Sequence, residues 1–138
     1  MKFFVDNNLP PVLAKILDAY LKVKHPDGKA IHLRERFPQD TPDIEWITEL
    51  GKEEDDWYVF TADLRIFRNK AEKQAWRQSG LSAFVFKKGL AEKPLHLKLA
   101  QIFRLMEKIE ARITHSRRAT STFLEELPAS GDKLKPVT

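Results

Sequence analysis

Three aspartates, Asp6, Asp43 and Asp63, stand where a folded chain is able to bring them together. Asp6 directly follows the apolar run Phe3–Val5, and Asp63 follows closely on the aromatic and β-branched run Trp57–Phe60. Short apolar runs of this kind predict buried strands. Asp43 stands at the start of a helix-like pattern. A carboxylate where a buried strand meets its loop is placed to hold a cation or to accept a proton.

The elements that must position these acids alternate along the chain. The apolar periodicity predicts strands at residues 2–5, 30–33, 57–60, 83–86 and 120–124, and helices at about 10–24, 42–50, 70–78 and 94–114. Strands that alternate with helices predict an α/β fold, in which helices cover both faces of a central, mainly parallel sheet of four to five strands. The carboxyl ends of parallel strands meet at one edge, where ligands bind. Asp6, Asp43 and Asp63 are therefore expected to converge there, although 37 and 20 residues separate them along the chain.

Oxygen ligands without cysteine favour a hard cation, Mg²⁺ or Mn²⁺. Such an ion, held by Asp6, Asp43 and Asp63, activates water for phosphodiester hydrolysis. Asn7 and Asn8 are candidates to add an amide oxygen or to orient a carboxylate, and Thr61 is a candidate hydrogen-bond donor. The alternative is structural: the two asparagines also suit a turn or a helix cap, and Asp43 an ordinary helix start.

Cationic residues follow Asp63 closely. The chain carries 24 Lys+Arg against 20 Asp+Glu, and this excess permits a polyanionic partner without requiring one. Arg65, Arg68 and Lys70 are candidates to hold RNA, because arginine grips a phosphate through two hydrogen bonds. Their alternative role is that of an ordinary solvated surface.

A length of 138 residues fits a single domain. We expect a compact core over about residues 1–115, followed by a C-terminal extension, 116–138, with an edge strand and a mobile tail. No run of about 18 apolar residues spans a membrane, and the absence of cysteine favours a cytoplasmic location. The apolar stripe of the last helix suits either the core or a homodimer.

At the residues that carry the acids, the chain resembles the PIN-domain-like proteins, and in particular the compact group of VapC-type toxin ribonucleases. The resemblance extends to about Lys88 and lies in three short motifs in the same order, Lys2–Pro10, Thr41–Trp46 and Thr61–Asp63, the last followed by Arg65-Ile66 and Arg68-Asn69. It implies a Rossmann-like, three-layer fold and a Mg²⁺- or Mn²⁺-dependent endoribonuclease. It also implies a toxin that cleaves RNA and is neutralised by a cognate antitoxin protein.

By resemblance, Asp6, Asp43 and Asp63 take the positions of the metal-binding acids. Many members of the family carry a fourth acid two residues after the third, and here that position is Arg65. The departure points to a one-metal site or to weakened activity. Glu45 or Asp40 are candidates to replace the missing acid, although Glu45 falls on another side of its helix from Asp43.

Two other functions compete with the nuclease. The first is a catalytically degenerate PIN-like module that binds a protein or a nucleic acid. The second is a phosphoacceptor receiver-like domain, which also places acids at strand ends. A receiver would use a lysine after a late strand, and Lys87 and Lys88 follow the fourth predicted strand.

Overall fold

A six-stranded sheet forms the centre of the molecule in the computed structural model, which describes residues 1–137. Its order is β2-β1-β3-β4-β5-β6; the first five strands are parallel, and the last pairs antiparallel with β5. The bounds are β1 (Lys2–Val5), β2 (Lys29–His32), β3 (Trp57–Thr61), β4 (Ser82–Phe86), β5 (Leu124–Leu127) and β6 (Lys135–Pro136). The predicted α/β fold is confirmed, with six strands in place of four or five.

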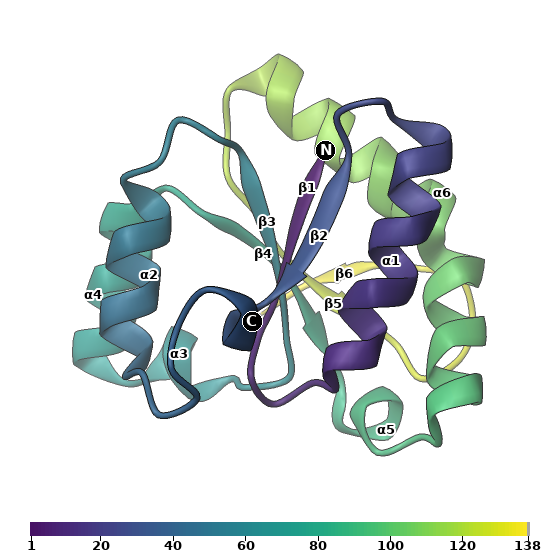
Figure 1. The fold of residues 1–138 in the computed structure, drawn as a ribbon, viewed down its shortest axis with the longest axis horizontal. Coiled ribbons are helices and arrows are strands. Elements are labelled where there is room, and N and C mark those ends of the chain that lie inside the picture. Colours follow the sequence, from purple (N-terminus) through teal and green to yellow (C-terminus); the bar gives the residue numbers. More distant parts are fainter. Residues whose placement is uncertain (138) are drawn as a thin grey trace.

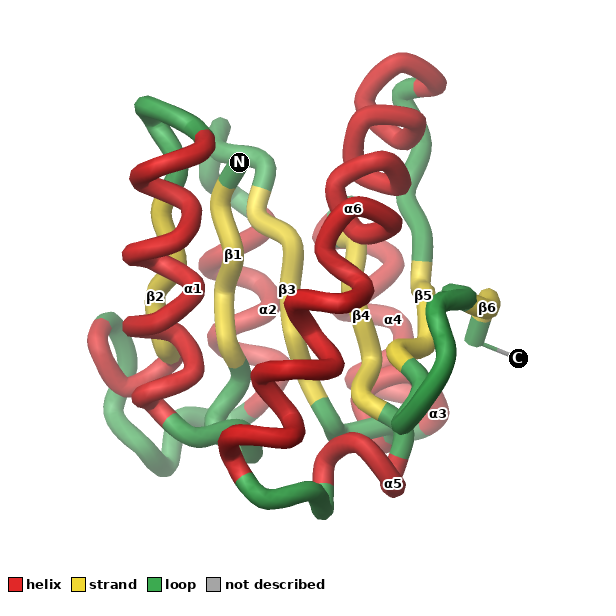
Figure 2. Tube along the Cα trace, turned by 90° about the vertical axis from the view of Figure 1, so that its right-hand side faces the viewer, coloured by secondary structure: helices red, strands yellow, loops and turns green. Residues whose placement is uncertain are grey.

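Helices cover both faces of this sheet (Figure 1). Their bounds are α1 (Pro11–Lys24), α2 (Asp43–Gly51), α3 (Arg65–Arg68), α4 (Lys70–Ser79), α5 (Lys88–Ala91) and α6 (Leu95–Ala119), with a 3₁₀ turn, η1, at Leu33–Glu35. Figure 2 shows α1 and α6 in front of the sheet, with α2 and α4 behind it. The molecule therefore has three layers. Among the described residues, none of these helices has the length and apolar character needed to cross a membrane.

Side chains from alternate strand positions fill two separate cores. Phe3, Val5 and Phe60 pack beneath α1 and α6, whereas Phe4 and Val59 pack beneath α2 and α4. Every residue of β3 and β4 is buried, as expected for parallel strands that are covered on both faces. The continuous apolar runs in the sequence reflect this double coverage.

The direction of winding reverses between β1 and β3. The chain leaves β1, crosses one face through α1 and returns as β2; it then crosses the other face through α2 and returns as β3, on the far side of β1. In open α/β sheets, ligands bind at such a reversal, beyond the carboxyl ends of the two central strands. Asp6 and Asp63 follow these two strands.

The C-terminal part differs from its prediction. Helix α6 continues to Ala119, beyond the predicted end near Thr114, and so runs across the expected boundary at residue 115. It stops at Thr120, which adopts a left-handed conformation (φ 51°). The strand predicted at 120–124 is wrong: β5 spans Leu124–Leu127 and is not an edge, since β6 pairs along its outer side.

The apolar stripe of α6 lies on the sheet, within the monomer. Ile102, Met106, Ile109 and Ile113 are buried there. The opposite face of the helix is less exposed than its polar sequence suggests. Gln101 is buried because the chain after β5 folds over it, and its amide donates hydrogen bonds to backbone oxygens of that segment.

The ends of α4 differ in how they are formed. Gly80 ends the helix in the left-handed region (φ 71°), which glycine adopts readily. Asn69 is the N-cap residue, but its side chain makes no capping hydrogen bond. The short helices α3 and α5, each of four residues, were not predicted.

Candidate active site at the carboxyl ends of β1 and β3

Asp6 is the first residue after β1 and is almost completely buried, with 3% of its surface exposed. Its backbone N–H donates to the Phe60 carbonyl at 2.9 Å and so continues the ladder with β3. Its carboxylate accepts the Thr61 hydroxyl at 2.7 Å and the Asn7 backbone N–H at 2.6 Å. The side chain is therefore held in one orientation at the carboxyl ends of β1 and β3.

The environment of Asp6 disfavours its charged form. Burial raises the pKa of this carboxyl to about 6, while the hydrogen bonds from Thr61 and Asn7 oppose the rise. The negative charges of Asp43 and Asp63 raise the pKa further. The charges of the other two acids thus reach Asp6.

Asp63 is fixed at the end of β3 by the same hydroxyl. Its backbone N–H donates to Thr61 Oγ1 at 3.0 Å. Its carboxylate is gripped by Arg65, whose Nε donates to Oδ1 at 2.9 Å and whose Nη2 donates to Oδ2 at 2.8 Å. The Arg65 backbone N–H adds a third bond at 2.9 Å. These bonds, led by the guanidinium, hold the pKa of Asp63 below its usual range.

Asp43 enters the site from the first turn of α2. It is half-buried, and its Oδ1 accepts the indole N–H of Trp46 at 3.0 Å. Trp46 is itself completely buried and stacks on Phe4 of β1, with ring centroids 5.2 Å apart. The core of the protein therefore orients this carboxylate.

Asn7 and Asn8 do not cap α1. The N-cap residue of that helix is Pro10, and the helix has no side-chain cap. Asn8 instead accepts the backbone N–H of Ala62 at 3.0 Å and so ties the loop after β1 to the loop after β3. Its amide nitrogen also lies 3.4 Å from both Asp6 Oδ2 and Thr61 Oγ1. Both asparagines lie in the turn after β1, where the Leu9 N–H donates to the Asp6 carbonyl at 3.0 Å, so the turn alternative holds and the helix-cap alternative is wrong.

Three residues from the end of β2 join the site without having been predicted. Arg34 in η1 donates through Nε to the Asn7 side-chain oxygen at 2.7 Å, and the Gln39 carbonyl accepts the Asn7 amide at 3.0 Å. His32 is buried, and its Nε2 lies 2.7 Å from the Leu9 carbonyl. Their position in the sequence could have indicated this, since β2 ends at the same edge of the sheet as β1.

His32 acts as a neutral hydrogen-bonding group. Burial lowers the pKa of this imidazole below its usual value. Its Nδ1 accepts the Arg34 backbone N–H at 3.2 Å, so that Nε2 carries the proton and donates to Leu9. His32 therefore anchors the loop that carries Asp6, and it is not a metal ligand.

The predicted RNA-binding cations differ in their surroundings. Arg65 is committed to Asp63, whereas Arg68 and Lys70 are exposed and make no side-chain hydrogen bond or ion pair within residues 1–137. Both exposed cations lie just beyond Asp63 along the chain, at the end of α3 and the start of α4. They are free to meet a ligand at this edge.

The arrangement of the acids decides whether they form a ready-made metal site. Over residues 1–137, no group of three or more carboxylate or imidazole side chains is arranged to hold a metal ion. Both oxygens of Asp63 are occupied by Arg65, and the two candidate substitutes for a fourth acid, Glu45 and Asp40, are exposed. Asp6 nevertheless offers a buried carboxylate whose charge a cation would stabilise. Within residues 1–137 the acids therefore do not form a ready-made cation site, and the Arg65 guanidinium occupies the Asp63 carboxylate.

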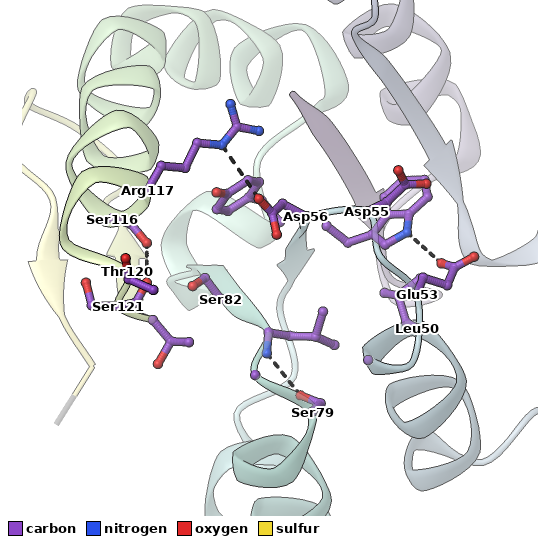
Figure 3. Close-up of a pocket in the computed structure, with 16 residues that line it drawn as sticks. Leu50, Glu53, Asp55, Asp56, Ser79, Ser82, Ser116, Arg117, Thr120 and Ser121 are labelled. Atoms are coloured by element: carbon purple, nitrogen blue, oxygen red, sulfur yellow. Dashed lines mark hydrogen bonds and ion pairs between the residues drawn. The ribbon is translucent and has the colours of Figure 1, made fainter.

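A cavity of about 460 Å³ lies at the opposite edge of the sheet, around the first residues of β3 and β4 (Figure 3). Two of its serine hydroxyls donate within the chain: Ser79 to the Trp76 carbonyl, and Ser116 to the Ser121 carbonyl. Asp56 there lies 4.0 Å from Arg117. The cavity is separate from the three acids.

The receiver-like alternative finds no support at the site. Lys87 follows β4 as predicted, but its amino group lies 3.4 Å from the Glu126 carboxylate on β5. It is paired along the sheet and does not reach across to Asp6.

The comparison with protein families agrees with the geometry. Residues 1–88 match the family described as PIN-like domain. This segment contains all nine predicted site residues, from Asp6 to Lys70. Neither the curated proteins nor the solved structures gave a match to the chain. PIN-like domains are in general nuclease-type domains. The match covers more than half of the 138 residues, and the chain therefore belongs to the PIN-like domain family.

Proposed function

We propose that this protein is an endoribonuclease that hydrolyses RNA phosphodiester bonds with Mg²⁺ or Mn²⁺. The observation that carries the proposal is the geometry around Thr61, whose hydroxyl donates to Asp6 and accepts the backbone N–H of Asp63. The Asp6 carboxylate and the backbone of Asp63, from neighbouring strands, are thereby tied to one hydroxyl, and the charges of Asp43 and Asp63 both act on Asp6. Clustered carboxylates favour a cation between them.

Each residue has a distinct part in this proposal. Asp6, Asp43 and Asp63 would hold the ion, and the ion when bound supplies an activated water and neutralises phosphate charge. Thr61 orients the Asp6 carboxylate and holds the backbone of Asp63, while Asn8 fixes the loops that carry both acids. The exposed cations Arg68 and Lys70 would hold the RNA backbone.

A role as the toxin of a type II toxin–antitoxin system belongs to the same proposal. It is supported by the resemblance of the three motifs to VapC-type toxins and by family membership. The cognate antitoxin would neutralise the protein in the cytoplasm. Expression of the wild-type chain in a bacterial host should then arrest growth, and Asp6→Asn should abolish the arrest.

RNA cleavage tests the activity directly. Structured RNAs are incubated with the protein and Mn²⁺ or Mg²⁺, then with EDTA, and the products are separated on a gel. We expect cleavage by the wild type, none with EDTA, and none by Asp6→Asn or Asp63→Asn. Asp27→Asn is the matched control, because Asp27 is exposed and lies after α1, at the opposite edge of the sheet. Cleavage that survives EDTA and both site variants would refute the proposal.

A second candidate is a binding module without catalysis. The ion pair between Asp63 and Arg65 favours it, since this pair occupies a carboxylate that a metal would need. In that case the wild type and Asp6→Asn bind nucleic acid or a protein partner equally well, and neither cleaves RNA.

A further inference from the structure

The ion pair between Asp63 and Arg65 joins one fixed residue to one movable residue. Asp63 is anchored by its backbone bond to Thr61, and only 12% of its side chain is exposed. Arg65 has 78% of its side chain exposed, and within residues 1–137 its guanidinium bonds to Asp63 alone. If the pair breaks, the arginine moves and the carboxylate stays in the site.

The guanidinium occupies the place that a bound cation would take at Asp63. Its two N–H groups use both carboxylate oxygens, at 2.9 and 2.8 Å. Asp63, and to a smaller extent the charge of Asp43, raise the pKa of Arg65. A divalent ion approaching Asp63 would meet a neutralised carboxylate and a like charge.

We propose that Arg65 is a resident counter-ion: it excludes a divalent cation from Asp63 in the free protein, and a phosphate of the nucleic-acid substrate draws it away. This inference rests on the proposed nuclease function and adds the order in which substrate and ion bind. The substrate releases Asp63 and the ion then binds, so that metal and nucleic acid bind cooperatively.

A phosphodiester is well suited to this exchange. A guanidinium donates two parallel hydrogen bonds to phosphate oxygens as readily as to a carboxylate. The exposed cations Arg68 and Lys70 lie within five residues of Arg65 and would attract the same backbone. When Arg65 leaves Asp63, the negative charge of the carboxylate is no longer compensated and attracts the ion. By linkage, the ion strengthens nucleic-acid binding by the same factor.

Titration with Mn²⁺, followed by the electron paramagnetic resonance signal of the free ion, tests the first half of the inference. Arg65→Gln should bind Mn²⁺ about fivefold more tightly than the wild type, because a partly exposed ion pair no longer competes. Arg118→Gln is the matched control: Arg118 is exposed in the last turn of α6, at the opposite edge, and should bind as the wild type does. Thermal unfolding of each variant without metal verifies that the fold is intact.

A single-stranded oligodeoxynucleotide tests the second half. It should tighten Mn²⁺ binding by the wild type several-fold more than by Arg65→Gln, since the variant has no counter-ion to release. Equal Mn²⁺ affinity of wild type and Arg65→Gln, with weaker binding by Asp63→Asn, would overturn the counter-ion and leave the nuclease proposal standing. Absence of Mn²⁺ binding by all variants, with and without the oligonucleotide, would overturn both.

Discussion

The Thr61 hydroxyl donates a hydrogen bond to Asp6 Oδ2 at 2.7 Å and so joins two residues that are 55 positions apart in sequence. The same oxygen accepts the backbone N–H of Asp63 at 3.0 Å. Thr61 is completely buried, and water therefore cannot replace either bond. A single hydroxyl thus sets the relative position of two acids that come from different strands.

Thr61→Val should separate this positioning role from the shape of the side chain. Valine keeps the volume of threonine but leaves the Asp63 N–H without a partner and removes the Thr61 bond to the Asp6 carboxylate, at a cost of about 1–3 kcal/mol in the free energy of unfolding. The pKa of Asp6 should rise further, because the Thr61 bond lowers it. Urea unfolding and the pH profile of RNA cleavage measure the two effects.

Thr61→Ser is the control for that variant, because it retains the hydroxyl. It should keep the cleavage profile of the wild type. If Thr61→Val also leaves the profile unchanged, the hydroxyl does not position the acids.

Asp6→Asn should stabilise the protein at neutral pH. The pKa of Asp6 is about 6 in the native state and 3.8 in the absence of the fold. Between about pH 4 and pH 6 the native state therefore holds the proton more tightly, and stability falls as the pH rises through this range. Above it the charged carboxylate destabilises the fold by about 2–3 kcal/mol. Asparagine carries no charge, so that the variant should unfold at a higher temperature than the wild type at pH 7.5 and at a similar temperature at pH 4.

Added Mn²⁺ should stabilise the wild type more than Asp6→Asn. An ion bound to the Asp6 carboxylate stabilises the native wild type by mass action. The same ion should have little effect on Asp6→Asn. An equal shift in both proteins would mean that Asp6 does not contact the ion.

Trp46→Phe should weaken the site through Asp43 alone. The indole N–H donates to Asp43 at 3.0 Å, and phenylalanine keeps the stacking on Phe4 while losing this bond. We expect Mn²⁺ affinity to fall by about fivefold, as for the loss of a bond of about 1 kcal/mol. Trp57→Phe is matched to it: Trp57 also packs on Phe4 and donates at 2.6 Å to a carboxylate, that of Glu53, at the opposite edge. A similar fall in both variants would point to a general loss of packing.

Asn8→Ala should loosen the loops after β1 and β3, with a small change in global stability. Asn8 is exposed, and the bond that it accepts from the Ala62 N–H is worth about 1 kcal/mol in unfolding. Its loss frees two loops that carry acids, so RNA cleavage should fall by about tenfold, a larger change than stability alone would cause. Asn69→Ala provides the comparison, since the Asn69 side chain is exposed and caps nothing. Equal activities of the two variants would contradict the link.

The parts of the fold that follow from apolar runs were predictable. The strands before Asp6 and Asp63 are continuous buried segments, and their parallel order was enough to place both acids at one edge. The pair between Asp63 and Arg65 was not predictable, because it depends on the rotamer of a long exposed side chain. The contacts of Asn7 with Arg34 and Gln39 depend on loop conformation, which a hydrophobic pattern does not encode.

The errors in the C-terminal part have a physical cause as well. Residues 120–124 are rich in β-branched and aromatic types, yet the chain there is still leaving α6, held by a bond from the Ser121 N–H to the Ser116 carbonyl. The strand proper, Leu124–Leu127, contains two glutamates and reads as polar. Glu125 is buried because it pairs with Arg112 of α6 at 2.8 Å. The ion pair thus allows a polar sequence to form a partly buried strand, which a search for apolar runs does not find.

Helix α6 lies outside the segment that matches the family, yet it completes the core of the protein. The family match ends at residue 88, and every acid of the site lies before that point. Yet the core beneath α1 is completed by Ile102, Leu105 and Ile109, which come after it. A fragment that keeps only the matched segment would retain α1 but expose to water the part of this face that α6 covers. The segment that carries the three acids therefore depends on apolar side chains from outside it to bury its sheet.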